Sequence, residues 1–168
     1  MFPSGPRYYL GSNASIVRQI GTDEVLMSFS NPTNATVILV YELWFSPRGT
    51  DFLHENNAME IVRTSSEGSG GSNMTQEALD LGNPVGAGMM LGINVDADGW
   101  STPPPVTDVL GGARPFNLAS GWRWTWADTG TPLIISPATS GIGFRMVWPP
   151  SVSLTFEVGA MIGLTGSA

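Results

Sequence analysis

The sequence has no lysine, no cysteine and a single histidine, and only 12% of its 168 residues are charged. An average soluble domain is about 25% charged, so this chain carries about half the usual charge. Without cysteine it has neither disulfides nor thiolate metal ligands. The side chains that most often act as nucleophiles or as general acids and bases are scarce. We therefore expect no enzyme activity, no cofactor and no metal site, and a surface suited to lying against other protein.

Clustered positive charge and long apolar runs are also missing. Fourteen carboxylates against seven arginines give a net charge of −7, and the arginines are scattered singly along the chain. A nucleic-acid backbone is bound by a basic patch, so we expect no nucleic-acid partner. No run approaches the ~18 apolar residues that cross a bilayer, and the first residues show no secretory signal. We expect no membrane partner.

What the chain does have is glycine and proline, 21 and 13 residues respectively, which weaken helix interiors. Between these breaks lie short runs that alternate apolar and polar residues or are rich in β-branched and aromatic ones, as strands do. This pattern predicts an all-β fold, an antiparallel β-sandwich that is jelly-roll-like with long Pro/Gly-rich loops. The predicted strands are Arg7–Leu10, Ala14–Ile20, Glu24–Ser30, Thr36–Phe45, Ala58–Ser65, Ala87–Val95, Trp122–Trp126, Pro132–Pro137, Ile142–Trp148 and Val152–Val158.

The length predicts a single domain overall. We interpret residues 1–30 as an N-terminal arm or first strands, and residues 31–168 as the β-sandwich domain. Ser65–Asn73 has the composition of a flexible linker or loop. Met74–Leu81 fits a helical turn or an extended segment equally well. Asp96–Asn117 is predicted to be a long loop, which in a compact domain is usually functional or an assembly arm.

The strand predicted at Thr36–Phe45 is apolar on both faces. Val37, Leu39, Tyr41, Leu43 and Phe45 fall on one face, and the other face carries a single charge, Glu42. Two explanations remain open: the strand is central and covered twice, or a partner partly buries it.

The six tryptophans are the sharpest individual signals. Trp122, Trp124 and Trp126 alternate and so share one face of a strand. That face is a sandwich core, a protein-binding surface or a platform that stacks sugar rings. Trp44, Trp100 and Trp148 lie on a second face, in a loop and at a strand end, and we predict that they contact a partner.

Two motifs that could belong to a catalytic or metal site are better explained as ordinary surface and turn residues. His54 lies beside Asp51 and Glu55, but a lone histidine next to a loop is most often a surface group. Asp96-Ala-Asp98-Gly99 resembles the opening of a calcium loop, yet the later ligands of an EF-hand are missing. A turn rich in Asp and Gly accounts for it.

Several segments of the chain resemble small virion proteins of tailed bacteriophages. The resemblance rests on the Trp-rich strand followed by Thr131–Pro137, Gly141–Val147 and Ser151–Glu157, and on Thr33–Glu42 and Gln76–Pro84. It covers roughly residues 31–159 and brings no catalytic residues. It implies a β-sandwich that decorates or cements a capsid, often as an oligomer, with the first thirty residues as a capsid-binding arm or an oligomer strand.

The resemblance and the composition together predict a structural virion protein on the capsid surface, made in the host cytoplasm. Its partners would be the major capsid protein or other virion proteins, and it would form a homo-oligomer, for which we assume a trimer. The alternative is a carbohydrate-binding β-sandwich module, displayed on a virion, that uses Trp122, Trp124 and Trp126, or Trp100 with Asp96 and Asp98.

Overall fold

The computed structural model describes most of the chain. The described residues are 7–11, 16–30, 36–48, 56–66, 68–70, 72–73, 75–78, 93–95, 100–128, 130–136 and 141–166. Almost all of their regular structure is β-strand, with one 3₁₀ turn, η1 (Trp126–Asp128). Within the described part, no helix is long and apolar enough to span a membrane.

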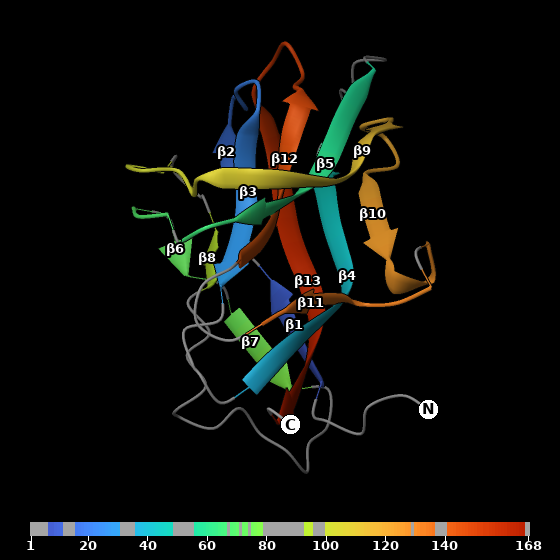
Figure 1. The fold of residues 1–168 in the computed structure, drawn as a ribbon. Helices are drawn as coiled ribbons and strands as arrows, with labels where there is room; N and C mark the ends of the chain where they lie inside the picture. Colours follow the sequence, from blue (N-terminus) through green and yellow to red (C-terminus); the bar gives the residue numbers. More distant parts are fainter. Residues whose placement is uncertain are drawn as a thin grey trace.

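The strands form two sheets in which every pair of neighbours is antiparallel (Figure 1). Sheet A has the order β10-β4-β13-β1-β7, with β11 beside β4 and β2 beside β13. Sheet B has the order β6-β8-β3-β12-β5-β9. The strands are β1 (Arg7–Gly11), β2 (Ile16–Arg18), β3 (Glu24–Ser30), β4 (Thr36–Arg48), β5 (Asn57–Thr64), β6 (Ser72–Asn73), β7 (Thr75–Ala78), β8 (Ile93–Val95), β9 (Val106–Phe116), β10 (Trp122–Thr125), β11 (Leu133–Ile135), β12 (Gly141–Trp148) and β13 (Leu154–Gly166).

The order of the strands is that of a jelly roll. Four antiparallel pairs are nested in the sequence: β1 with β13, β3 with β12, β4 with β10, and β5 with β9. This nested pairing arises when one long antiparallel hairpin is rolled up. Its successive strand pairs then fall alternately in the two sheets. The prediction of an all-β, jelly-roll-like sandwich is therefore confirmed. The described strands before residue 31 are the first strands of these sheets.

The core lies between the sheets and is closely filled by aromatic and branched side chains. Trp124 is 1% exposed, and Phe45, Phe144 and Phe156 are equally buried. Phe45 contacts Phe156 across neighbouring strands, with ring centroids 5.1 Å apart. Fully burying one such side chain contributes on the order of 1.5–3 kcal/mol, so this cluster accounts for much of the stability of the fold.

The simple alternation predicted for β4 is wrong in its first half. Met161 on β13 lies opposite Glu42, but Ile162 lies opposite Val40, so Tyr41 is an extra residue in a β-bulge. The bulge reverses which face each side chain takes. Ile38 and Val40 therefore join the core together with Leu43 and Phe45, while Leu39 and Tyr41 belong to the other face.

Two predicted boundaries also change. The predicted loop Asp96–Asn117 contains β9, which pairs with β5 along its length in spite of Gly111 and Gly112. Both glycines have positive φ and lie in a bulge between Leu110 and Arg114, where the chain leaves the ladder and returns. The last strand, predicted to end at Val158, continues to Gly166, because small residues mask an alternation that Ala160, Ile162 and Leu164 maintain.

The segment between β5 and β9 is fastened to sheet B. Residues 65–66 and 68–70 run antiparallel to residues 100–105, joined at Ser69 and Thr102 and by the Ser65 amide to the Pro105 carbonyl. We call this pair of segments the crossing ribbon. Figure 1 shows β9 and the green segment that leads to β6 passing in front of β3. The composition of Ser65–Asn73 predicts a flexible linker or loop, and its described residues are an anchored loop that ends in β6.

The outward-facing side of sheet B is buried as well as its inward side. Ser28 and Val62 lie on either side of Gly143 in one row that points away from the core, yet both are at most 3% exposed. The Ser28 hydroxyl lies 3.4 Å from the Thr64 hydroxyl, so two buried polar groups satisfy one another. The hydrogen bond from Trp100 Nε1 to the Val25 carbonyl holds the crossing ribbon against β3, the strand that carries Ser28.

The close approach of β3 and β12 gives a test of the packing of sheet B. A methyl group added at Gly143 would collide with the Met27 carbonyl oxygen of β3. We predict that Gly143→Ala lowers the free energy of unfolding by about 1–3 kcal/mol, measured by urea denaturation. Gly21→Ala is the control, because there the added methyl meets only the flexible Glu24 side chain on the surface. Equal midpoints for the two variants would contradict the packing described.

Candidate interaction surfaces

The three tryptophans predicted to contact a partner occupy three different environments. Trp148, at the end of β12, is 55% exposed. Trp44 is half-buried on the outer face of sheet A. Trp100 is half-buried at the crossing ribbon. The three indoles therefore do not form one surface, and each has to be considered by itself.

Trp100 is used inside the chain. Its Nε1 donates a hydrogen bond of 2.7 Å to the Val25 carbonyl oxygen on β3. Its ring packs so closely on Gly68 that a β-carbon there would overlap the indole and also approach Pro104. Gly68 and Pro104 are themselves buried. Trp100 thus fastens the crossing ribbon to sheet B. That it also contacts a partner stays a prediction.

The tryptophan ladder lies mostly in the core. Trp122 and Trp124 point between the sheets and are at most 5% exposed, and Trp122 packs on Phe144 with ring centroids 5.3 Å apart. Trp126 falls in η1, after the strand has ended, and packs partly buried against the same core. A sugar ring cannot reach buried indoles, so the platform interpretation of this ladder is dropped.

Three exposed apolar residues, Val17, Trp148 and Val152, lie on segments that meet at one end of the sandwich, and we call them the apical patch. All three side chains are at least 41% exposed. Val17 of β2 lies opposite Thr155 at the start of β13, and the turn of residues 149–153 joins β12 to β13. This turn is uppermost in Figure 1.

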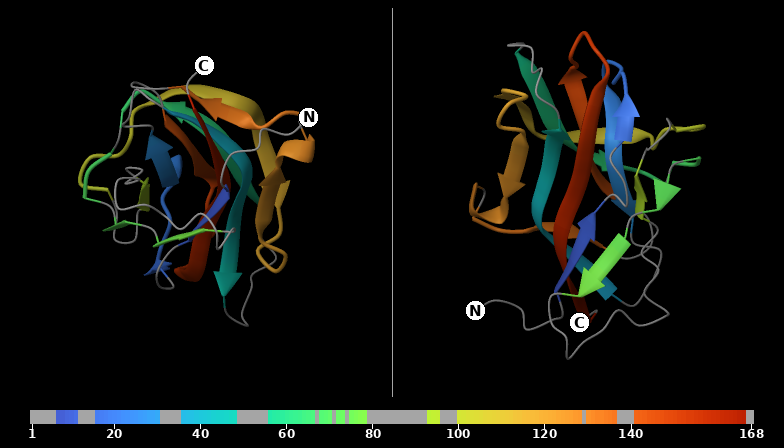
Figure 2. Two further views of the ribbon diagram at one scale, coloured as in Figure 1. Left: turned by 90° about the horizontal axis from the view of Figure 1, so that it is seen from below. Right: turned by 180° about the vertical axis from the view of Figure 1, so that it is seen from behind.

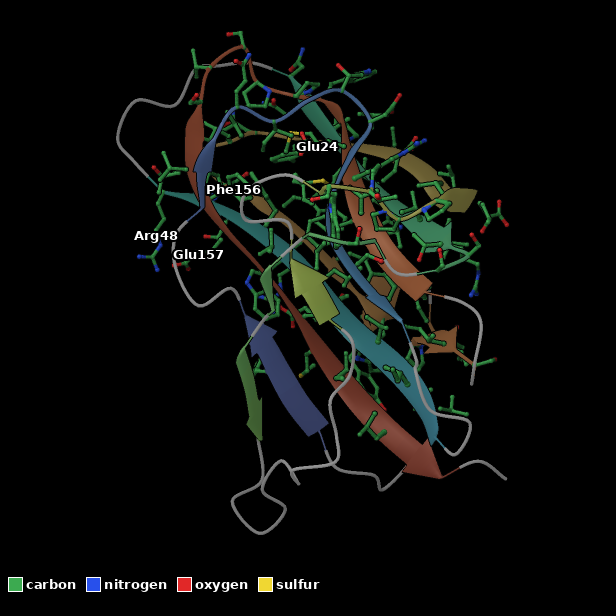
Figure 3. The ribbon with its side chains drawn as sticks, turned by 90° about the vertical axis from the view of Figure 1, so that its left-hand side faces the viewer. Glu24, Arg48, Phe156 and Glu157 are labelled. Carbon is green, nitrogen blue, oxygen red and sulfur yellow. The ribbon has the colours of Figure 1, made fainter. Side chains whose placement is uncertain are left out.

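Ion pairs lie on the strands that lead to the apical patch. Arg145, three residues before Trp148 on β12, binds Glu60 of β5 with Nη2 2.8 Å from Oε2, and its Nη1 lies 3.9 Å from Oδ1 of Asp23. On sheet A, Arg48 at the end of β4 pairs with Glu157 on β13, and their Nη2 and Oε1 atoms are 2.8 Å apart. Figure 3 shows the Arg48 and Glu157 side chains turned toward one another on the outside of the sheet, whereas Phe156 between the sheets is fully buried.

A second surface is a hollow on the outer face of sheet A. It has a volume of about 340 Å³ and is open to solvent. No described segment crosses β4 and β13 when sheet A faces the viewer, as in the right-hand view of Figure 2. The outward-facing side chains that line this hollow come from β1, β4, β10 and the turn before β10: Tyr9, Glu42, Trp44, Ser46, Ser120 and Arg123.

Strand register explains why these residues meet. Trp44 lies opposite Arg123 on one side and opposite Gly159 on the other. Gly159 has no side chain, and its partner on β1 is Gly11, so the row beside Trp44 stays empty. In the next row, Tyr9 stands opposite Met161, and its ring meets that of Trp44 edge to face at 5.9 Å and 72°.

An ion pair forms the polar wall of the hollow. Nε and Nη2 of Arg123 bind the two carboxylate oxygens of Glu42 at 2.7 and 2.9 Å. The Arg123 side chain is 67% exposed, whereas that of Glu42 is 12% exposed. Such a two-point contact fixes both groups and makes the wall neutral as a whole.

The sequence points to Trp44 but does not identify Tyr9, Glu42 and Arg123 as members of one site. Their assembly depends on β1 and β10 flanking β13 and β4 in one particular register, which alternation alone does not encode. Glu42, the one charge of the predicted strand Thr36–Phe45, is the only local signal. His54, Asp96 and Asp98 lie outside the described residues. Among the residues that the structure describes, no group of three His, Cys, Asp or Glu is placed to hold a metal ion.

Comparisons with known proteins give little. No family model and no curated protein matches the chain. Among solved structures, it is similar to a chain from the structure of Cocksfoot mottle virus, with 12% identity over 99% of this chain and 96% of that chain, and a TM-score of 0.28. A TM-score this low does not establish a shared topology, so this likeness carries no argument about fold or function.

The structural role assigned to Trp100 is testable by comparison with Trp148. We predict that Trp100→Phe lowers the free energy of unfolding by about 1–2 kcal/mol, because the hydrogen bond to Val25 and part of the packing on Gly68 are lost. Trp148→Phe, at an exposed position, should change it by less than about 0.5 kcal/mol. Urea denaturation of both variants measures the difference. Equal effects would mean that Trp100 does not fasten the crossing ribbon.

Proposed function

We propose that this chain is a structural protein of a virion, which decorates or cements the capsid through protein–protein contacts. The observation that carries the proposal is the apical patch on a jelly-roll sandwich. The jelly roll occurs in viral capsid proteins, and also in lectins and cupins, so the fold is compatible with several functional classes and does not decide among them. We choose the virion role from the properties of the protein's surface.

The apical patch has the properties of a protein-binding surface. Exposed Trp148 is a residue type that dominates binding energy at interfaces, and Val152 and Val17 are further exposed apolar side chains toward the same end of the sandwich. Charged residues are depleted at the centre of interfaces, and none of these three residues is charged. An end of the sandwich is also suited to binding over a junction between shell subunits, because a contact there leaves the outer faces of both sheets uncovered.

Composition supports the same proposal. A chain with no lysine and 12% charge loses little solvation energy when its surface is covered by another protein. The proposal accordingly includes no enzyme activity and no nucleic-acid or membrane partner. It places the protein on the capsid surface, bound to the major capsid protein or other virion proteins, as a homo-oligomer for which a trimer is the working assumption.

The proposal predicts that the apical patch is needed for attachment to particles. Trp148→Ser should reduce co-sedimentation with particles of the virus that encodes the chain by about tenfold or more in apparent affinity, as for loss of an interface hot spot. Ile134→Ser is the control, since Ile134 is similarly exposed but lies on β11 in sheet A. Sedimentation of the wild-type chain at a fixed copy number per particle is the matching positive result.

Two outcomes would contradict the proposal. One is a wild-type chain that stays in the supernatant with purified particles. The other is a folded Trp148→Ser variant that sediments as well as the wild type.

A further inference from the structure

The hollow on sheet A has features of a ligand site that a role in particle assembly does not require. We propose that it binds one ring of a neutral sugar, stacked at Trp44 and Tyr9 and hydrogen-bonded by Arg123 and Glu42. The hollow is separate from the apical patch: Gly159, beside Trp44, lies four residues along β13 from Thr155, beside Val17, which is roughly 13 Å.

The aromatic wall suits the apolar face of a pyranose. Tyr9 is 41% exposed, and Trp44 is half-buried, so both present ring surface to solvent. Because the two rings stand at 72° to one another, they form a corner. A ring that lies flat on one of them contacts the other at its edge, which fixes its position with two rigid groups that have little rotamer freedom to lose.

The polar wall suits hydroxyl groups. In their mutual contact Arg123 uses two of its five N–H donors, and each Glu42 oxygen accepts one of them. The remaining guanidinium donors and carboxylate lone pairs stand side by side. Neighbouring hydroxyls of a sugar are each both donor and acceptor, so they match this arrangement, and the Ser46 hydroxyl lies on the same rim.

The charge and the size of the hollow limit which classes of ligand can bind there. Glu42 already neutralises Arg123, and a phosphate or carboxylate would have to compete with it for the guanidinium, so an anion gains little here. A volume of about 340 Å³ is at the lower end of the roughly 300–1,000 Å³ of small-molecule sites, which suits one ring with a neighbour in solvent. The open rim lets a longer glycan extend outward.

The test is a titration with methyl glycosides of glucose, galactose, mannose and N-acetylglucosamine, followed by ligand-observed NMR. We expect at least one of them to bind with a dissociation constant of about 1 mM or below. Trp44→Ala should weaken that binding at least tenfold, and Arg123→Gln should weaken it while the fold is retained. Trp148→Ala, a tryptophan of the apical patch, is the matched control and should bind sugar as the wild type does.

Inorganic phosphate and N-acetylneuraminic acid form the anionic arm, and both should bind more weakly than the best neutral sugar. The proposal is overturned if no neutral glycoside binds, if the anions bind best, or if Trp44→Ala binds sugar unchanged. Loss of particle sedimentation in Trp44→Ala without any sugar binding would overturn it too, by making the hollow a protein contact. Failure of Trp148→Ser to affect sedimentation bears on the virion proposal alone.

Discussion

The pairing of β13 with β4 is the contact on which the rest of the molecule depends. It runs from Thr155 opposite Arg48 to Gly166 opposite Thr36, and it places the last strand between β4 and the first strand. Sheet A cannot take its final form before strands from both ends of the chain have met, and in both sheets most contacts join residues distant in sequence. Folding of such topologies is slow, because chain entropy is lost before the contacts form. The hollow depends on the same pairing, since β13 lies between β1, which supplies Tyr9, and β4, which supplies Trp44 and Glu42.

Local patterns in the sequence predict the strands well and their mutual placement poorly. Glu24–Ser30 is predicted with its observed bounds, because its turns and apolar residues are all local signals. The bulge at Tyr41 is invisible in the sequence, because apolar residues on both sides of β4 allow either phase. β9 is hidden by Gly111 and Gly112, which are ordinary turn signals and here belong to a bulge within a strand.

The same limit applies to the candidate surfaces. Trp148 is recognisable as an exposed residue because it ends a strand beside two prolines, a local feature. Trp100 looks equally exposed in a long loop, yet the tertiary fold turns its N–H toward Val25. The hollow forms only when β1, β4 and β10 are in register. Its residues are therefore set by strand pairing, and no single sequence motif identifies them. The low charge of the sequence, by contrast, is informative by itself, because it limits the polarity of the whole surface wherever the strands lie.

The bulge at Gly111 and Gly112 affects how copies of the protein can associate at high concentration. β9 is the edge strand of sheet B, and an exposed edge offers free amide and carbonyl groups to any strand of a neighbouring molecule. Where the two glycines leave the ladder, with open space around each, that edge is interrupted and cannot template a continuous intermolecular sheet. Copies of the chain at high concentration are therefore less able to join through this edge of sheet B.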